Sequence, residues 1–508
     1  MYLRKGRIKT WQPLLVLALF LSMLTFSERC FAVPMNNIQD TQPIYTPFGS
    51  DKFYTEKKGT EIRFHLSPFY QQTKSARDDT GKKVPIGDIY GPWNMFGVFF
   101  KADGANASTD GNPLPTGKTL ANFTNLQKSY NELKRLRSEK DTTFANGTQT
   151  NLYRDKDFTS EAEFNPDIDT VGTYEAVPVR YEKMGVRGQL CFDFSFGLGL
   201  GVRMGLVNYR QIQEFSTNND FKRIAGLPYT TVASGVTTDN PPLPVGDPGF
   251  DPSANLIAKN VLDGRARDML ASDLELDLSD VHETEAEDSH VYLFWRHAFR
   301  INDKDNYHVA SIIPYFSVGI WLPTGEEKDQ NRPFSIATGN DGFTGISLEG
   351  SLNFDFPKTI QVGLGGGFVF FNERDLVNQR VPSSLFQSGI TPWKVNICKE
   401  PGMTWYVNAS FKSDDFIKNL SFYFDYLYTE HLKDEVTLLE KNATRAKAFA
   451  PGVSMLQDQS QWKNQQFNIG FDYRIAPFLA IGVGAQAHIS GIQVYRSTTL
   501  IGSIGMTF

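Results

Sequence analysis

The chain has 508 residues, of which 40% are hydrophobic and 13% aromatic, and its formal net charge is −6. After the first 33 residues no stretch approaches the roughly 20 apolar residues that a membrane-spanning helix needs, which excludes a helical membrane protein for the rest of the chain. Lys and Arg form no basic block, so we expect no nucleic-acid partner. The 40 Phe, 20 Tyr and 42 Gly favour strands and tight turns, and one large all-β domain is admissible at this length.

Residues 1–32 predict a signal peptide. Four basic residues lie between positions 4 and 9, an apolar run follows from Leu14 to Phe26, and Cys30-Phe31-Ala32 fits a cleavage site. A lipoprotein signal acylated at Cys30 is disfavoured because Glu28 and Arg29 stand where small residues are expected. The alternative is a retained N-terminal anchor helix. Export is the better interpretation, because the apolar core is short for a membrane span.

From about residue 180 the chain alternates apolar and polar residues with a period of two, as strands do. In the segment 346–356, Leu348 and Leu352 belong to an apolar set, and Glu349 and Asn353 belong to a polar or small set. The next segment repeats the pattern after the short join 357–359. Similar stretches lie at 183–193, 198–206, 289–301, 308–321, 404–412, 420–429, 466–474, 481–490 and 499–508.

Short and long connections alternate along these strands. The short joins lie at 195–197, 302–307, 357–359, 413–419 and 475–478, and the long polar segments lie at 211–288, 322–342, 373–401 and 434–462. Short periplasmic turns and long extracellular loops are typical of antiparallel membrane β-barrels. A soluble all-β protein, the alternative, gives no reason for this alternation. We therefore predict an all-β fold, a transmembrane antiparallel β-barrel.

The last strand carries the most specific local signal. Leu500, Ile504 and Met506 form an apolar set that ends at the C-terminal aromatic Phe508. This strand resembles the terminal strand of Gram-negative outer-membrane β-barrels, a porin-like class, in which the aromatic end is read by the barrel-assembly machinery. The resemblance covers the signal, the strand pattern from about 180 to 508 and this strand, and Trp321–Gly325 also looks like segments of several barrel families. It implies an outer-membrane location, outer-membrane lipid and the assembly machinery as partners, and Phe508 as the terminal assembly signal.

Eleven strands follow residue 180, and both ends of a bacterial barrel are periplasmic, so at least one more strand is required. Residues 62–67 supply it and give 12 strands. A further strand at Trp93–Phe100, with another hidden in 103–178, would give 14. The expected organisation is a signal peptide at 1–32, a periplasmic or plug-like segment at 33–59, and a barrel at 60–508 in which the polar segment 103–178 is unassigned.

The polar set predicts a lumen for small hydrophilic solutes or ions, because opposed charges across a narrow waist select solutes by charge and size. The alternative for these charges is mutual pairing that plugs the barrel. Two other functions stay open: a plugged transporter of hydrophobic solutes of the fatty-acid type, which would need inward apolar residues, and a scaffold or adhesin acting through its loops. The predicted pore-lining residues are Lys183, Arg187, Asp193, Arg203, Arg300, Glu349, Asp355, Lys412, Asp425, Asp472 and Arg474.

No motif indicates catalysis, a metal or a cofactor. The seven His residues are scattered, and the chain contains neither GxSxG nor HExxH. Cys191 and Cys398 form no CxxC pair, and we expect two lone thiols or, as the alternative, a long-range disulfide. The acidic run from Asp273 to Asp288 could collect cations but lacks calcium-loop spacing and reads more simply as a solvated face. The sequence leaves the oligomeric state open.

Overall fold

The computed structural model describes residues 60–90, 93–94, 143–144, 147–148, 173–174, 179–194, 196–213, 272, 274–302, 307–356, 360–382 and 393–508. The predictions for 1–32 and 33–59 lie outside the described residues, as does most of 103–178. Within the described ranges, no helix is both long enough and apolar enough to cross a membrane.

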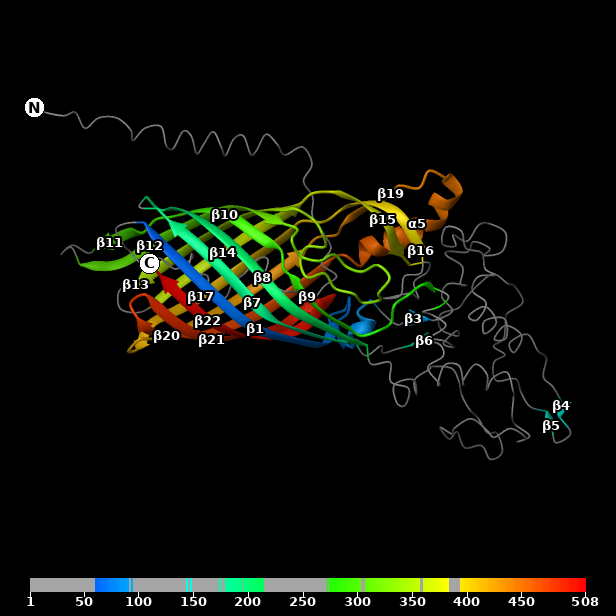
Figure 1. Ribbon diagram of the computed structural model, residues 1–508, viewed down its shortest axis with the longest axis horizontal. Helices are drawn as coiled ribbons and strands as arrows, with labels where there is room; N and C mark the ends of the chain where they lie inside the picture. The colour runs from blue at the N-terminus through cyan, green and yellow to red at the C-terminus, as the bar shows by residue number, and fades with distance from the viewer. Residues whose placement is uncertain are drawn as a thin grey trace, which may run out of the picture.

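Twelve antiparallel strands form a closed barrel whose long axis runs horizontally in Figure 1. Each strand pairs with its neighbours in chain order, so β10, for example, pairs with both β8 and β12. The pairing of β1 with β22 closes the ring. The strands are β1 (Glu61–Arg77), β7 (Val179–Asp193), β8 (Leu198–Gln213), β10 (Ser289–Arg296), β12 (His308–Leu322), β13 (Gly345–Phe356), β14 (Ile360–Phe371), β17 (Thr404–Ile417), β18 (Leu420–His431), β20 (Trp462–Ala476), β21 (Leu479–Ile492) and β22 (Val494–Thr507).

The first and last strands meet at the seam of the barrel. The N–H of Phe508 donates to the carbonyl of Ile62 at 2.8 Å, and the N–H of Ile62 donates to the carbonyl of Phe508 at 3.1 Å. The prediction of 12 strands with the first at 62–67 is therefore confirmed. The 14-strand alternative is wrong, because β3 (Trp93–Asn94) pairs with β6 (Thr173–Tyr174) outside the ring.

Side-chain exposure follows the predicted alternation. Leu364, Val483 and Leu500 are 63%, 64% and 58% exposed, whereas Glu349 and Asp425 are 5% and 0% exposed. Apolar side chains thus face outward and polar side chains face inward, the reverse of a soluble sandwich. This arrangement suits a wall surrounded by lipid, because alternate strand residues face the lipid and the lumen.

The connections depart from prediction at three places. The predicted loop 211–288 ends early, because β9 (Val281–Ala286) extends the barrel wall by pairing with β8. The predicted join 413–419 is shorter, because β17 continues through an irregular register to Ile417. One connection at the extracellular end is a single residue, Gln493, whose N–H donates to the carbonyl of Asp78 beyond β1.

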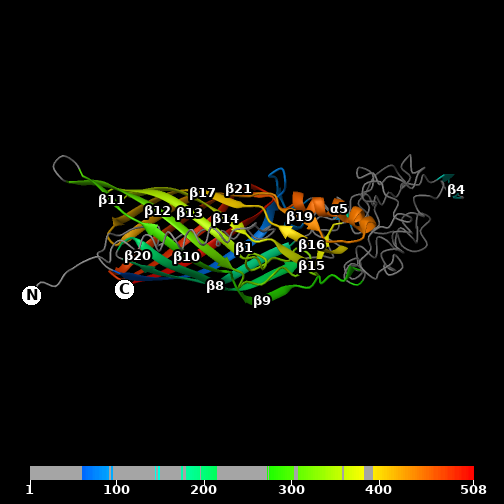
Figure 2. The same cartoon turned by 90° about the horizontal axis from the view of Figure 1, so that it is seen from above.

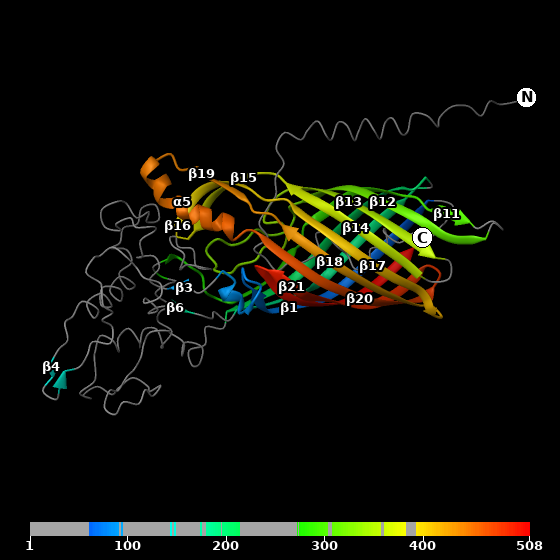
Figure 3. The same cartoon turned by 180° about the vertical axis from the view of Figure 1, so that it is seen from behind.

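A small subdomain, here called the cap, covers the extracellular end of the barrel (Figures 1 and 2). It contains a three-stranded sheet of β15 (Arg374–Val381), β16 (Trp393–Glu400) and β19 (Glu435–Leu438), and helix α5 (Ala443–Asp458) packs on it. The C-terminus lies at the opposite end, as Figure 3 also shows from behind. The remaining short elements are β2 (Lys83–Val84), η1 (Ile86–Asp88), β4 (Thr143–Phe144), β5 (Gly147–Thr148) and β11 (Phe299–Asn302).

Candidate functional site

Glu287 is the centre of an ion cluster inside the barrel. Its two carboxylate oxygens accept hydrogen bonds from Arg187 at 2.6 and 2.7 Å, and Lys183 Nζ lies 2.8 Å from Oε1. All three side chains are buried. Sequence analysis predicted both cations to face inward but left Glu287 in the acidic run. Once 281–286 is recognised as a strand that pairs with β8, the register of this pairing predicts that the side chain of Glu287 points inward.

Asp193 forms a second cluster nearer the periplasmic end of β7. Arg63 Nε donates to Asp193 Oδ2 at 2.7 Å, and Arg296 Nη2 donates to Oδ1 at 2.9 Å. These arginines come from β1 and β10, which are remote from Asp193 in sequence. Both were missed as candidates, although Arg63 belongs to the polar set of the predicted first strand.

Asp425 is fully buried on β18, and each of its carboxylate oxygens accepts a hydrogen bond from an asparagine side chain. Asn408 Nδ2 donates to its Oδ1 and Asn468 Nδ2 to its Oδ2, both at 2.9 Å. These asparagines lie on the two strands that flank β18, so three neighbouring strands place one carboxylate and two amides at the same level of the lumen.

The other predicted pore-lining residues divide into inward and peripheral groups. Arg203 and Glu349 are buried, and the Arg203 guanidinium carbon lies 4.5 Å from the centre of the Tyr292 ring. Lys412 lies 2.8 Å from Asp414. Half-buried positions are held by Asp193, Asp355, Lys412 and Asp472, and exposed positions near the periplasmic end are held by Arg300 and Arg474. The structure therefore does not place Arg300 and Arg474 among the buried charges.

One side of the lumen is aromatic, unlike the polar or small inward set that the alternation predicts for the other strands. Tyr292, Phe294 and Tyr315, from β10 and β12, form a buried cluster. A Cβ at Gly199 would lie 2.2 Å from the Phe294 ring, and one at Gly201 would lie 2.1 Å from the Tyr292 ring. The glycines on β8 thus let these rings lie across the neighbouring strand. The pattern was missed because residues 291–295 are apolar in both alternate sets.

Cys191 packs in the same cluster, and Cys398 lies half-buried on β16. Both are free thiols, which confirms the first interpretation and excludes the disulfide alternative.

Asp288 fastens the extracellular loop 323–344 to the barrel. Its Oδ1 accepts the N–H of Gly325 at 2.9 Å, and its Oδ2 accepts the N–H of Asn340. Beside it, Thr324 Oγ1 donates to the carbonyl of Glu287 at 2.8 Å. A Cβ at Gly339 would lie 2.2 Å from Asp288 Oδ1, so the loop can come this close to Asp288 only with glycine at position 339. The end of the Trp321–Gly325 segment therefore has a structural role here.

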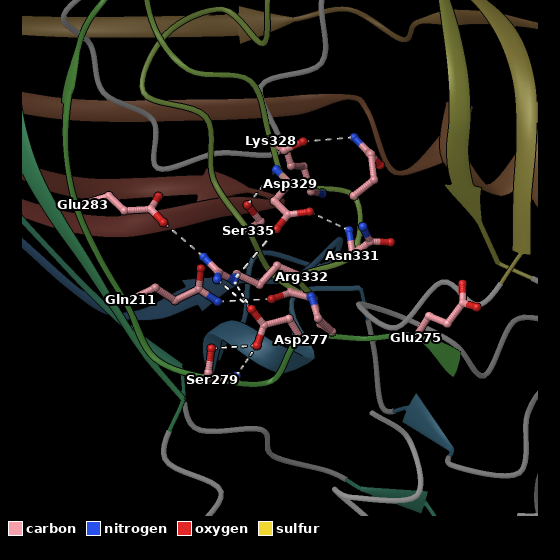
Figure 4. A network of polar contacts seen from close by, with 12 residues as sticks. Gln211, Glu275, Asp277, Ser279, Glu283, Lys328, Asp329, Asn331, Arg332 and Ser335 are labelled. Atoms are coloured by element: carbon pink, nitrogen blue, oxygen red, sulfur yellow. Dashed lines mark hydrogen bonds and ion pairs between the residues drawn. The ribbon is translucent and has the colours of Figure 1, made fainter. Parts of the chain in front are cut away.

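Arg332 organises the same loop (Figure 4). Its Nη2 lies 2.6 Å from Asp277 Oδ2, and its Nη1 lies 3.5 Å from Glu283. Burial raises the pKa of Asp277, but hydrogen bonds from Ser279 and Arg332 outweigh that effect and lower this pKa to about 2. Asp277 and Glu287 of the acidic run thus neutralise the protein's own cations. Among the described residues, no group of three or more His, Cys, Asp or Glu side chains is arranged to hold a metal ion.

A buried hydrogen-bonded chain joins the two loops that contribute to the cap. His431 Nδ1 lies 2.7 Å from Thr404 Oγ1, and its Nε2 lies 3.0 Å from Asp434 Oδ1. The same Asp434 oxygen accepts the N–H of Gly402 at 2.9 Å. The order Thr, His, Asp is that of a nucleophile, base and orienting acid. All three side chains are buried, however, and their hydrogen bonds hold the ends of β17 and β18 together, so their role here is structural.

No protein-family model and no curated protein matches the sequence. Among solved structures, the chain is similar to an outer membrane channel from Pseudomonas putida F1, with 9% identity and a TM-score of 0.42 over 91% of this chain and 100% of that one. It is also similar to the translocator domain of the autotransporter NalP from Neisseria meningitidis, with 7% identity and a TM-score of 0.34 over 90% and 92% of the two chains. A Pseudomonas aeruginosa FadL homologue gives 10% identity and a TM-score of 0.24 over 94% and 96%.

Proposed function

We propose that the protein is an outer-membrane channel for small hydrophilic solutes or ions. The observation that carries the proposal is the opposite chemistry of the two faces of one closed wall. Leu364 and Val483 expose apolar side chains outward, while Arg187, Glu287 and Asp425 turn ionisable side chains inward. An outward apolar band and a polar interior are what a barrel with an aqueous lumen requires.

The pairing inside the wall supports selection rather than unrestricted flow. Arg187 and Lys183 both pair with Glu287, and Arg63 and Arg296 both pair with Asp193. Fixed charges held by neighbouring strands keep a constant position, so they define where a solute meets positive or negative potential. We assign transport rather than catalysis to the interior.

A second candidate, transport of hydrophobic solutes, is favoured by the aromatic side of the lumen. Tyr292, Phe294 and Tyr315 offer a continuous apolar surface along β10 and β12. We rank it second because the buried residues of β1, β13 and β20 are mainly polar, including Gln71, Glu349 and Asn464.

Single-channel conductance of the detergent-purified mature protein in a planar bilayer tests the choice. We expect reproducible conductance steps and a reversal potential under a salt gradient that reports ion preference. A protein that stays folded and heat-modifiable yet gives no steps would contradict an open hydrophilic pore. Uptake of a hydrophobic solute into proteoliposomes by that same preparation would then establish the second candidate.

A further inference from the structure

A cavity of about 80 Å³ lies between the extracellular mouth of the barrel and the cap. Its wall is formed by loop 323–344, by the sheet strands β15 and β16 and by the start of β22, among other segments. One water needs roughly 10–15 Å³ measured in this way. The cavity therefore has room for several waters or for a small organic ion.

Its wall contains more cations than anions. Lys328, Arg332, Arg380 and Lys399 line it, against the two carboxylates Asp341 and Asp434. Arg332 is paired with Asp277 outside the wall. The excess of positive charge over the two carboxylates therefore lies on the side of the cavity that carries Lys328 and Lys399.

The two lysines have no ion-pair partner within 4.0 Å among the described residues. Burial lowers the pKa of both Lys328 and Lys399. Asp341 partly restores that of Lys328, and the positive charge of Lys399 lowers it again. Asp434 and Asp341 likewise partly restore the pKa of Lys399. Two ammonium groups thus share one recess without a direct ion pair among the described residues, an arrangement that costs free energy unless an anion joins them.

The nearby polar groups are already used in holding the wall. Asp341 Oδ1 accepts the backbone N–H of Lys328 at 2.8 Å, and Asp434 Oδ1 accepts from His431 and Gly402. Arg380 Nη2 donates to three neutral oxygens, those of Leu274, Glu275 and Asn331, at 2.9, 2.9 and 3.1 Å. These hydrogen bonds hold the backbone segments around the two lysines, so the cavity is formed before any ligand binds.

The loop that carries Lys328 is also tied to the sheet that carries Lys399, through the neighbouring strand of that sheet. Gln379 Nε2, on β15, donates to Gln330 Oε1 in loop 323–344 at 2.7 Å. Asp329 N–H donates to Ser335 Oγ at 3.1 Å and closes the loop on itself (Figure 4). A site held in this way binds with less loss of conformational freedom.

We propose that this cavity is an entry site that binds small anionic solutes through a carboxylate or phosphate group between Lys328 and Lys399. The inference rests on the proposed channel function and names the class of solute that the channel admits. An anion that pairs with both ammonium groups is held at the extracellular mouth, where Tyr495 at the start of β22 also lines the cavity.

The first test measures binding and does not require conduction. Folded protein in detergent is titrated with acetate and, at the same ionic strength, with its neutral analogue acetamide, and the midpoint of thermal unfolding is followed. Acetate should raise the midpoint and acetamide should not, because a ligand that binds the folded state stabilises it. The double variant Lys328→Met/Lys399→Met should bind acetate about tenfold or more weakly, as expected for losing charged hydrogen bonds.

Two controls separate the site from general electrostatics. Lys441→Met removes the same charge from an exposed position beyond β19 and should leave the acetate response unchanged. Lys328→Arg/Lys399→Arg keeps both charges and should retain the response. Because removing unneutralised charges relieves an unfavourable burial, we expect the double Met variant to fold. If it does not, the single variants carry the comparison.

The second test is the reversal potential under a KCl gradient. The wild type should prefer anions, the double Met variant should shift toward cations, and Lys441→Met should behave as wild type. An equal response to acetate and acetamide, or an undiminished acetate response in the Met variants, would overturn the anion site. Absence of conductance with intact acetate binding would instead overturn the channel and leave the anion site standing.

Discussion

The barrel wall and the cap handle charge in different ways. In the wall, the buried cations Lys183 and Arg187 meet Glu287, and Arg63 and Arg296 meet Asp193. Next to the cap, Arg332 of loop 323–344 is paired in the same manner, whereas Lys328 of this loop and Lys399 of the cap face a shared cavity without an ion pair among the described residues.

The difference indicates which charges maintain the structure and which are available to a ligand. A buried charge left without a partner costs free energy of folding, so a buried charge with a purely structural role is expected to have a partner of opposite charge. The unneutralised pair occurs where a cavity opens at the mouth. The following predictions test this division.

The largest effect is expected at the seam of the wall. Deleting Phe508 removes both hydrogen bonds to Ile62 and the terminal aromatic, and should greatly reduce the fraction of protein that reaches the folded, heat-modifiable form. Phe508→Tyr, which keeps the ring and the backbone bonds, should assemble as wild type. Normal surface assembly of the deletion variant would show that the terminal residue is not an assembly signal.

Replacing Glu287 with Gln should be the most destabilising change in the interior. It leaves Lys183 and Arg187 buried without their carboxylate, and breaking a buried ion pair from one side costs about 3–5 kcal/mol. Urea unfolding in lipid vesicles measures the loss. Glu182→Gln, which removes a partly exposed partner of Arg180 at 3.4 Å, should change stability by about 1 kcal/mol or less. Similar effects of the two variants would contradict the distinction between interior and surface charges.

Leu348→Arg tests the outer face of the wall. An arginine that faces lipid near the middle of the membrane should reduce the free energy of unfolding by roughly 2–4 kcal/mol. Leu348→Met conserves volume and apolarity and should be tolerated. The same unfolding assay applies, and tolerance of arginine would mean that this strand face does not contact lipid.

The smallest and most local effect is expected in loop 323–344, beside the cap. The pKa of Asp277 is lowered to about 2, so its contribution to stability is complete above its ordinary pKa of 3.8 and is lost as the pH falls through about 2. Cleavage of residues 323–344 by pepsin, normalised to an unfolded substrate, should therefore increase between pH 4 and pH 2. The Asp277→Asn variant should be cleaved readily at both pH values. If cleavage of the wild-type protein does not increase, the ion pair between Asp277 and Arg332 does not hold this loop in place.

Predictability from sequence differed within the barrel wall for a local reason. The regular alternation around Leu348 and Leu500 identified most of the strands and their faces, because one residue in two must face lipid. It failed for residues 291–295, which are apolar on both faces, and for Glu287, which looked like part of an acidic loop. In both places the information lay on the neighbouring strand β8, in its glycines and its register.

By itself the sequence determined the class of fold, limited the strand count to 12 or 14, and determined the inward direction of Lys183, Arg187 and Asp425, since a period of two is a property of the single chain. Only the tertiary structure decided which charges meet. Asp193 and Arg63 are 130 positions apart, and Lys328 and Lys399 reach one cavity from different loops. Such pairings depend on closure of the ring and on docking of the cap, and no local pattern encodes either.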